Sequence, residues 1–377
     1  MPEIIQPYNL PLLSFFSGGG FLDMGFEMAG FETVFSNELD QDFAKFYSEG
    51  MSSWSGKNRK ITIVGDIAGI PKESLPINMK RPFGIIGGPP CQDFSIRGHK
   101  TGFDGLRGTL TYHFYEKIMD LQPTFFLMEN VPGLVMLKKT KEAFKEILEL
   151  FEEDYFISMS KLNSLHFGSP QFRERLFIFG IRRSLMSKRQ GSNVSFTWPK
   201  PLFPRAEKMY NWGEPEFKKT DLAMLMEDPP KKLCVSSILI EGIKMNEIPN
   251  GQEYFNFKSF EKVGSILEGD TYRPSFKRLH RNKYSPTACY GNNEVHVHPV
   301  EHRRISVRES LRIQGLPDSY ILETKGNLTK KFKMIGNGVP VPLARAVADS
   351  IIIFLKEIEV IKMDCHLVPD DSSVSNS

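Results

Sequence analysis

Short apolar runs alternate with amphipathic stretches through the first half of the chain. Runs of this length, bounded by turn-forming residues, are typical of strands buried in a parallel sheet. Seven are predicted to be strands, at residues 12–16, 33–36, 61–64, 83–87, 125–129, 157–162 and 176–181. The clearest helix pattern between them is 140–151, where apolar residues from Phe144 to Phe151 recur at the spacing of one helical face. This alternation predicts an α/β fold with a mostly parallel, doubly wound sheet.

The pattern changes after Arg183. No alternation of strand and helix returns, and prolines at positions 199, 201, 204, 215, 229 and 230 interrupt any long element. A second, smaller and irregular domain is therefore expected over residues 184–324.

An almost continuous apolar helix is predicted near the end of the chain, at 341–355. Such a helix needs a core to enter, and the sheet is the expected one. Residues 1–183 and 325–365 would then form one domain, and the acidic, serine-rich residues 366–377 a disordered tail. The helix positions expected to be buried are Val347, Ala348, Ile351 and Leu355.

Composition narrows the class of protein. The 377 residues suggest about two domains, and 40% hydrophobic with 25% charged residues exclude disordered and fibrous classes. The net charge of +3 neither requires nor excludes a nucleic-acid partner, so a basic patch must be sought locally. Four cysteines without a C-x-x-C pair indicate neither a disulfide framework nor a metal site. With no signal peptide and no membrane span expected, a cytoplasmic location is predicted.

The loops that follow the strands carry the candidate chemistry, because ligands of such sheets bind outside the carboxyl ends of the strands. A glycine-rich turn and helix at 15–31 would let a ligand approach the backbone, although a simple strand-to-helix turn would look the same. Glu38, after the second strand, could accept hydrogen bonds from ribose hydroxyls. Asp66, after the third, could accept one from an exocyclic amine. Taken singly, either acid could equally be a helix cap or a solvated charge.

Three further residue types fit a reaction centre. Cys91 in the segment GGPPCQDFS is a candidate nucleophile, since prolines fix the path of its loop, although a buried inert cysteine is the ordinary alternative. Glu129 emerges from an apolar strand, so its pKa should be raised, which suits a general acid. Arg173 and Arg175 are the cations that a thiolate or a phosphate would need.

Seven motifs stand in a fixed order: FxGxG, PPCQ, RGTL, ENV, QxRxR, RxxSVRES and GNGVPxPLA. With these motifs in this order, the chain resembles the C5-cytosine DNA methyltransferases. The resemblance covers roughly the first 180 and the last 75 residues. The resemblance implies the S-adenosylmethionine-dependent methyltransferase fold. It also implies transfer of a methyl group from S-adenosylmethionine to carbon 5 of a cytosine that is flipped out of double-stranded DNA.

The resemblance also implies roles for residues. Cys91 would be the nucleophile, Glu129 would bind N3 and the amino group of the cytosine, Arg175 would lie on its O2 side, and Arg173 near the cysteine or a phosphate. The loop 91–110 would be a lid that closes on DNA, with Gln92, Ser95 and Arg107 contacting it. The cofactor would be held by Phe16, Gly18 and Gly20 at its methionine end, by Glu38 at its ribose, by Asp66 and Ile67 at its adenine, and by Pro90, Leu110 and Asn337.

The segment 273–283 contains basic residues and no acidic one, with aromatic residues interleaved. A solvated basic loop is the ordinary alternative. Because the family's variable target-recognition region lies between QxRxR and RxxSVRES, residues 184–301 are expected to read DNA sequence in the major groove. The residues expected to contact phosphates are Arg273, Lys277, Arg278, Arg281 and Lys283.

Two departures from the family pattern stand out. Phe21 replaces the last glycine of FxGxGG, and Gly338 stands where alanine or serine is usual. Neither touches the chemistry, although the first leaves open how closely the backbone approaches the ligand.

Two competing functions are weighed. A tRNA cytosine methyltransferase of the same fold lacks a long recognition region, whereas residues 184–301 number about 118. A catalytically silent DNA-binding regulator would be free to lose Cys91, which is present. The expected protein is a monomeric bacterial or phage modification enzyme, nucleoid-associated, with a restriction endonuclease as a candidate functional partner.

Overall fold

The structure is a computed structural model that describes residues 8, 10–59, 61–90, 109–136, 138–186, 194–213, 226–240, 242, 244–257, 260–287, 290, 295–323 and 326–361. The predicted tail at 366–377 lies outside the described residues. So do four of the predicted site residues: Cys91, Gln92, Ser95 and Arg107.

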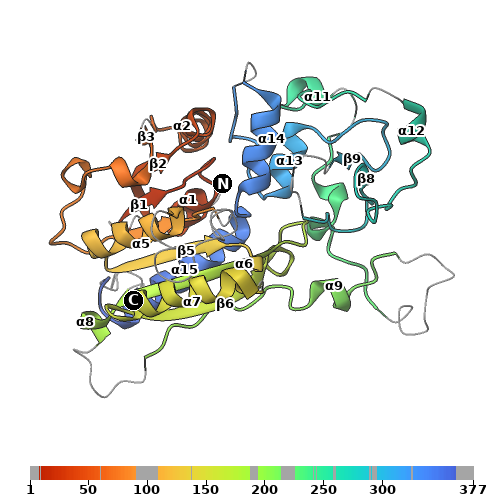
Figure 1. The fold of residues 1–377 in the computed structure, drawn as a ribbon. Coiled ribbons are helices and arrows are strands. Elements are labelled where there is room, and N and C mark those ends of the chain that lie inside the picture. Colours follow the sequence, from red (N-terminus) through yellow and green to blue (C-terminus); the bar gives the residue numbers. More distant parts are fainter. Residues whose placement is uncertain are drawn as a thin grey trace, which may run out of the picture.

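A seven-stranded sheet forms the centre of the part that the structure describes (Figure 1). Its strands lie in the order β3-β2-β1-β4-β5-β7-β6. The pairs among β1 to β5 are parallel, and β7 runs antiparallel to both β5 and β6. The strands are β1 Pro11–Phe15, β2 Glu32–Glu38, β3 Thr62–Val64, β4 Gly84–Gly87, β5 Phe125–Asn130, β6 Tyr155–Asn163 and β7 Glu174–Arg182. The seven predicted strands and the mostly parallel sheet are confirmed.

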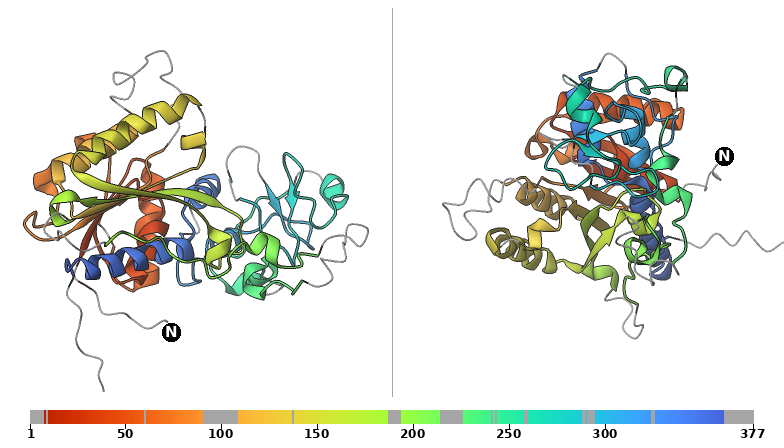
Figure 2. Two further views of the ribbon diagram at one scale, coloured as in Figure 1. Left: turned by 90° about the horizontal axis from the view of Figure 1, so that it is seen from below. Right: turned by 90° about the vertical axis from the view of Figure 1, so that its right-hand side faces the viewer.

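Helices cover both faces of the sheet, as Figure 2 shows from below. Leu12 and Ile86 pack on the face of α1 (Phe21–Met28) and α15 (Val341–Glu357). Their neighbours Leu13 and Ile85 point the other way, toward α5 (Leu110–Leu121) and α7 (Lys138–Glu152). This alternation along buried strands is what a doubly wound sheet requires.

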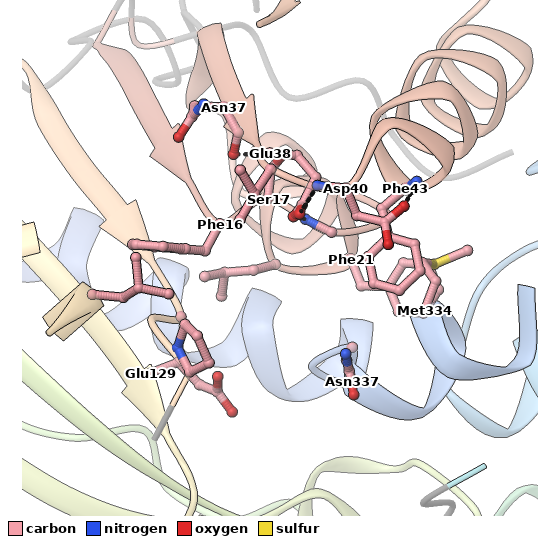
Figure 3. Close-up of a pocket in the computed structure, with 18 of the residues that line it drawn as sticks. Phe16, Ser17, Phe21, Asn37, Glu38, Asp40, Phe43, Glu129, Met334 and Asn337 are labelled. Atoms are coloured by element: carbon pink, nitrogen blue, oxygen red, sulfur yellow. Dashed lines mark hydrogen bonds between the residues drawn. The ribbon is translucent and has the colours of Figure 1, made fainter. Parts of the chain in front are cut away.

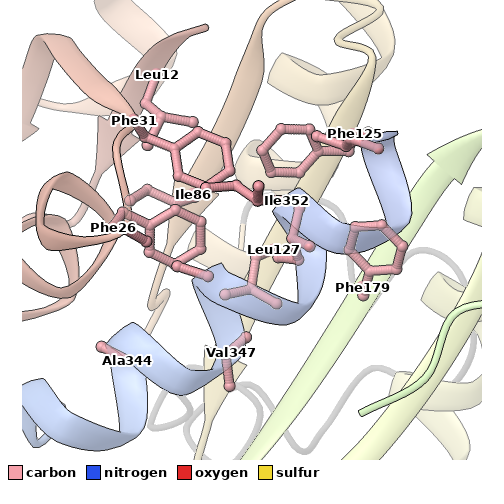
Figure 4. Packing of buried hydrophobic residues seen from close by; sticks show 14 of the residues in the cluster. Leu12, Phe26, Phe31, Ile86, Phe125, Leu127, Phe179, Ala344, Val347 and Ile352 are labelled. Carbon is pink, nitrogen blue, oxygen red and sulfur yellow. The ribbon is translucent and has the colours of Figure 1, made fainter. Parts of the chain in front are cut away.

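Helix α15 enters the core as predicted. Figure 4 shows Ala344, Val347 and Ile352 of this helix against Leu127 and Phe179 of the sheet. By length and composition the stretch Leu328–Glu357 could cross a membrane, but most of its apolar window is buried in the protein. The helix is therefore placed as a core element, and all four positions expected to be buried are buried: Val347, Ala348, Ile351 and Leu355.

The region after β7 has little regular structure, as expected. Its described elements are short: α8 Arg183–Met186, α9 Ala206–Met209, α11 Lys244–Glu247, α12 Phe260–Gly264, and the parallel pair β8 Lys277–Arg278 and β9 His296–Val297. Two longer helices follow, α13 Val307–Ile313 and α14 Leu328–Asn337. Their apolar residues share one cluster with Phe21 of α1 and with Phe43 and Tyr47 of α2 (Gln41–Ser55). The irregular region thereby reaches the carboxyl edge of the sheet.

Candidate active site

A cavity of about 510 Å³ opens at the carboxyl ends of β1 to β5 (Figure 3). This volume is in the range of small-molecule and cofactor sites. Figure 3 shows Phe21 and Met334 together at one end and Glu129 toward the other. Of the nine residues predicted to bind a cofactor, eight line it: Phe16, Gly18, Glu38, Asp66, Ile67, Pro90, Leu110 and Asn337. Gly20 is the exception. It is the N-cap of helix α1, between the lining residues Gly19 and Phe21.

The glycine turn after β1 is tightly constrained. Gly18 and Gly20 have φ of 54° and 78°, in the left-handed region that favours glycine. A side chain at Gly20 would also lie within 2.9 Å of Tyr47 and Met51. Phe16 has φ of 55°, which is strained for a bulky residue. Strained backbone of this kind is typical of ligand sites.

Glu38 is fixed at the end of β2. Its Oε2 accepts a hydrogen bond from the Gly18 N–H at 2.8 Å, and its Oε1 accepts one from the Asp40 N–H at 3.0 Å. Burial raises the pKa of Glu38, and these backbone donors oppose the rise. The carboxylate is thus held rigidly at the cavity wall, where it can accept further hydrogen bonds from ligand hydroxyls.

Asp66 follows β3 and lines the same cavity. It caps the short helical turn Ile67–Gly69, because its Oδ1 accepts from the Ala68 N–H at 2.9 Å. Asp66 therefore acts as a helix cap and also lines the cavity. Ile67 beside it is buried and supplies an apolar wall.

Glu129 and Arg175 form an ion pair at the other end of the cavity. Arg175 Nε lies 2.7 Å from Glu129 Oε1 across the antiparallel strands β5 and β7. Burial raises the pKa of Glu129, while the charges of Arg175 and then Arg173 lower it, and burial prevails. The expected rise in the pKa of this carboxyl is confirmed in direction, and its cause is the one predicted.

The segment that leads to Cys91 is held against Glu129. Asn130 Nδ2 donates to the Pro89 carbonyl at 2.9 Å, and a Cβ at Gly88 would lie 2.9 Å from Glu129 Oε2. Gly88 and Pro90 both line the cavity. The chain therefore passes directly beside the buried acid before it reaches the predicted nucleophile.

Comparison with known proteins decides the family. A family model described as C-5 cytosine-specific DNA methylase matches residues 10–353. The chain belongs to this family. It is accordingly a DNA (cytosine-5-)-methyltransferase, and the family and the fold imply S-adenosylmethionine as methyl donor.

Relatives match nearly the whole chain. The type II methyltransferase M.NmeDI of Neisseria meningitidis serogroup C is 35% identical over 356 residues, covering 89% of this chain and 82% of that protein. The type II methyltransferase M.FnuDI of Fusobacterium nucleatum is 34% identical, covering 94% and 98%. A crystal structure of a prophage-encoded E. coli protein, assigned as a DNA modification methyltransferase, has a TM-score of 0.63 at 26% identity. It covers 92% of this chain and 100% of that chain.

In this methylase Arg173 belongs to the buried part of the site, and its charge acts on Glu129. Its side chain is fully buried and donates to the Gly336 carbonyl at 2.5 Å, at the end of α14. Gln171 acts alongside it, donating to Gln314, whose own amide donates to the Ile335 carbonyl at 2.8 Å. A phosphate contact by Arg173 is not compatible with this burial, so that alternative is corrected. The other alternative, a place near Cys91, lies outside the described residues. The bond to Gly336 positions the last turn of α14, which carries Asn337.

The RxxSVRES motif of the methylase is structural. Ser306 and Glu309 form a capping box at the start of α13, and Arg303 pairs with Glu309 through bonds of 2.6 and 2.8 Å. Arg308 is fully buried and donates to the Tyr320 carbonyl at 2.8 Å. Tyr320 in turn donates from its hydroxyl to the Gly19 carbonyl at 2.7 Å. The sequence carried no signal for Tyr320, because this contact joins residues 301 positions apart.

The basic segment is only partly available for phosphates. Arg273 and Arg281 are exposed, and Lys277 and Lys283 are half-buried. Acidic residues just before the segment reduce its charge. Glu268 receives two bonds from the Arg281 guanidinium, at 3.0 and 3.1 Å, and Asp270 lies 3.6 Å from Arg273.

The prediction that Arg278 contacts phosphates is wrong, because its side chain is buried. It is 3% exposed, and its guanidinium donates to the carbonyls of Val263 and His298 at 2.8 and 2.9 Å. A guanidinium that is buried and bonded in this way holds the fold of the region together. It does not present a charge to DNA.

Proposed function

We propose that this methyltransferase modifies one cytosine within a short duplex DNA word, with Cys91 as nucleophile and Glu129 as the acid that serves N3 of the base. One observation carries the proposal: a buried carboxyl with a raised pKa, paired to Arg175, lies at the end of the cavity where the segment 88–90 leads to Cys91. Arg175 would also face the O2 side of the cytosine.

The cavity residues fit the implied cofactor. The carboxylate of Glu38 would hold the ribose hydroxyls, Asp66 and Ile67 would meet the adenine, and Phe16, Gly18 and Gly20 would surround the methionine end. Pro90, Leu110 and Asn337 would complete the wall. When bound, S-adenosylmethionine supplies an electrophilic methyl group.

The chain's own residues would prepare the base to accept that group. The Cys91 thiolate forms a bond to carbon 6, and the displaced electron pair is shared between carbon 5 and N3. Glu129 donates a proton to N3, so carbon 5 becomes enamine-like. Once carbon 5 carries the methyl group, water takes up the carbon 5 proton, the C5–C6 double bond forms again, and the carbon 6–sulfur bond breaks to release the thiolate. The N3 proton returns to Glu129.

A base inside the stack cannot be attacked in this way, so the cytosine must be flipped out, at a cost of a few kcal/mol. Phosphate contacts from Arg273, Lys277, Arg281 and Lys283, and from Gln92, Ser95 and Arg107, would offset that cost.

We assign residues 1–183 and 325–365 to catalysis and 184–324 to target recognition. The relatives are named type II methyltransferases, which supports a modification enzyme that is paired with a restriction endonuclease. It would act as a monomer on DNA of the bacterial nucleoid.

Transfer of a labelled methyl group tests the substrate class. Purified full-length chain is incubated with methyl-labelled S-adenosylmethionine and either unmethylated plasmid DNA or unmodified tRNA. Label in DNA alone is the expected result, and it should be lost in the Glu129→Gln variant. Label in tRNA alone would establish the alternative of a tRNA cytosine methyltransferase.

A further inference from the structure

The ring of Phe21 occupies an unusual place at the end of the cavity. It is 2% exposed, yet it forms part of the cavity wall. Its Cε1 lies 3.0 Å from the position that a Cβ on Gly19 would take. The ring therefore fills the space between the glycine turn and the end of helix α14, where Figure 3 shows it beside Met334.

Gly338 borders the same ring. Its φ of −62° and ψ of 154° are open to any residue, so the backbone does not require glycine there. The requirement comes from Phe21, because a Cβ on Gly338 would lie 2.1 Å from Phe21 Cδ2 and 2.7 Å from Cε2. A larger residue at 338 and a phenyl ring at 21 cannot both keep these positions.

The Phe21 ring is also packed against Tyr320. The two ring centroids are 5.7 Å apart and the ring planes meet at 82°, an edge-to-face arrangement. Tyr320 is fully buried and tied to the Gly19 carbonyl. A side chain at 338 would therefore press on a ring that already contacts fixed protein groups and that borders the cavity.

We propose that Phe21 and Gly338 are a matched pair of positioning residues that sets the shape of the cofactor cavity at this end. The two departures from the family's sequence pattern, Phe21 and Gly338, then compensate each other. The aromatic ring takes the volume that a side chain at 338 would fill. The inference rests on the proposed use of this cavity for S-adenosylmethionine.

A double-mutant cycle tests the pair, with the dissociation constant for S-adenosylmethionine measured by calorimetry on the full-length chain. Gly338→Ala should weaken binding about tenfold or more when Phe21 is present, because the added Cβ overpacks a ring that forms part of the cavity wall. The same substitution in a Phe21→Ala or Phe21→Leu background should change affinity less than about twofold, since room for the Cβ has been made. Gly133→Ala is the matched control, because a Cβ there meets nothing within 4 Å.

The outcomes separate the two claims. Equal losses from Gly338→Ala with and without the ring would overturn the pair while leaving the cofactor assignment intact. Failure of the unaltered chain to bind S-adenosylmethionine would overturn the assignment and the pair together. Thermal unfolding of each variant shows whether it is folded, and rescue by Phe21→Leu distinguishes a matched pair from a general loss of structure.

Discussion

Glu129 and Arg175 are joined across two antiparallel strands, with 2.7 Å between Oε1 and Nε. The pairing holds the carboxyl at the cavity while burial keeps its pKa above the usual value. A group with a raised pKa keeps or shares a proton to higher pH than an exposed glutamate does. That property is what donation to N3 of a cytosine requires.

Glu129→Gln should therefore lower the rate of methyl transfer by about 10² to 10⁴, the usual contribution of a general acid. The amide retains the size of the side chain but has no proton to exchange. Binding of S-adenosylmethionine should stay within about twofold of the unaltered chain, since Glu38 and the glycine turn are untouched. Single-turnover kinetics together with calorimetry check both parts, and an unchanged rate would remove Glu129 from the mechanism.

Arg173→Met should lower the free energy of unfolding by about 2–3 kcal/mol, because it leaves the buried Gly336 carbonyl without its charged donor. It should also weaken cofactor binding by loosening the turn that carries Asn337. Urea denaturation measures the first effect and calorimetry the second. Arg81→Met, at an exposed position, is the control and should change stability by less than about 0.5 kcal/mol. Equal stability of the two variants would show that Arg173 has no positioning role.

The basic residues of this region that remain accessible, among them exposed Arg273 and half-buried Lys277, should govern the salt dependence of DNA binding. Arg273→Ala with Lys277→Ala should reduce the slope of log K against log salt by about 0.9 for each phosphate contact that is lost. Lys145→Ala, on the outer face of α7 and 75% exposed, should leave the slope unchanged. A slope unaffected by the double substitution would place the DNA elsewhere on the surface.

Arg278→Ala should instead destabilise the fold, because the carbonyls of Val263 and His298 would lose their donor.

Asp23 makes stability depend on pH. It is fully buried beneath the glycine turn, where Ser14 and Tyr47 each donate to it at 2.8 Å, and burial raises its pKa from 3.8 to about 6. A raised pKa stabilises the fold at low pH, and this contribution is lost as pH rises through about 6. The unfolding free energy of Asp23→Asn relative to the unaltered chain should thus rise by on the order of 3 kcal/mol between about pH 4 and 7. Denaturation series at several pH values measure the difference, and a constant difference would contradict the assigned pKa.

The strands and helix α15 could be predicted because their signal is local. The central strands are short runs buried on both faces, whereas β3 and β6 at the two edges of the sheet also carry exposed side chains. Helix α15 is apolar on the side that packs against Leu127 and Phe179. The antiparallel direction of β7 was not expected from this pattern, since a buried strand has the same composition in either direction.

The site could be predicted only in part. Loops after strands meet at one edge, so Glu38, Asp66 and Glu129 were expected to converge, and they do line one cavity. The sequence pattern gave no signal for roles that depend on residues far apart in the chain. The carbonyls that bury Arg278 come from residues 263 and 298, and the hydroxyl that holds Gly19 comes from Tyr320.

The most direct test of the account is bisulfite sequencing of plasmid DNA from cells that express the full chain or its Cys91→Ala variant. We expect 5-methylcytosine at a single short word with the unaltered chain and none with the variant. Methylation that persists without the Cys91 thiol, or its absence from the DNA of both cultures, would contradict it.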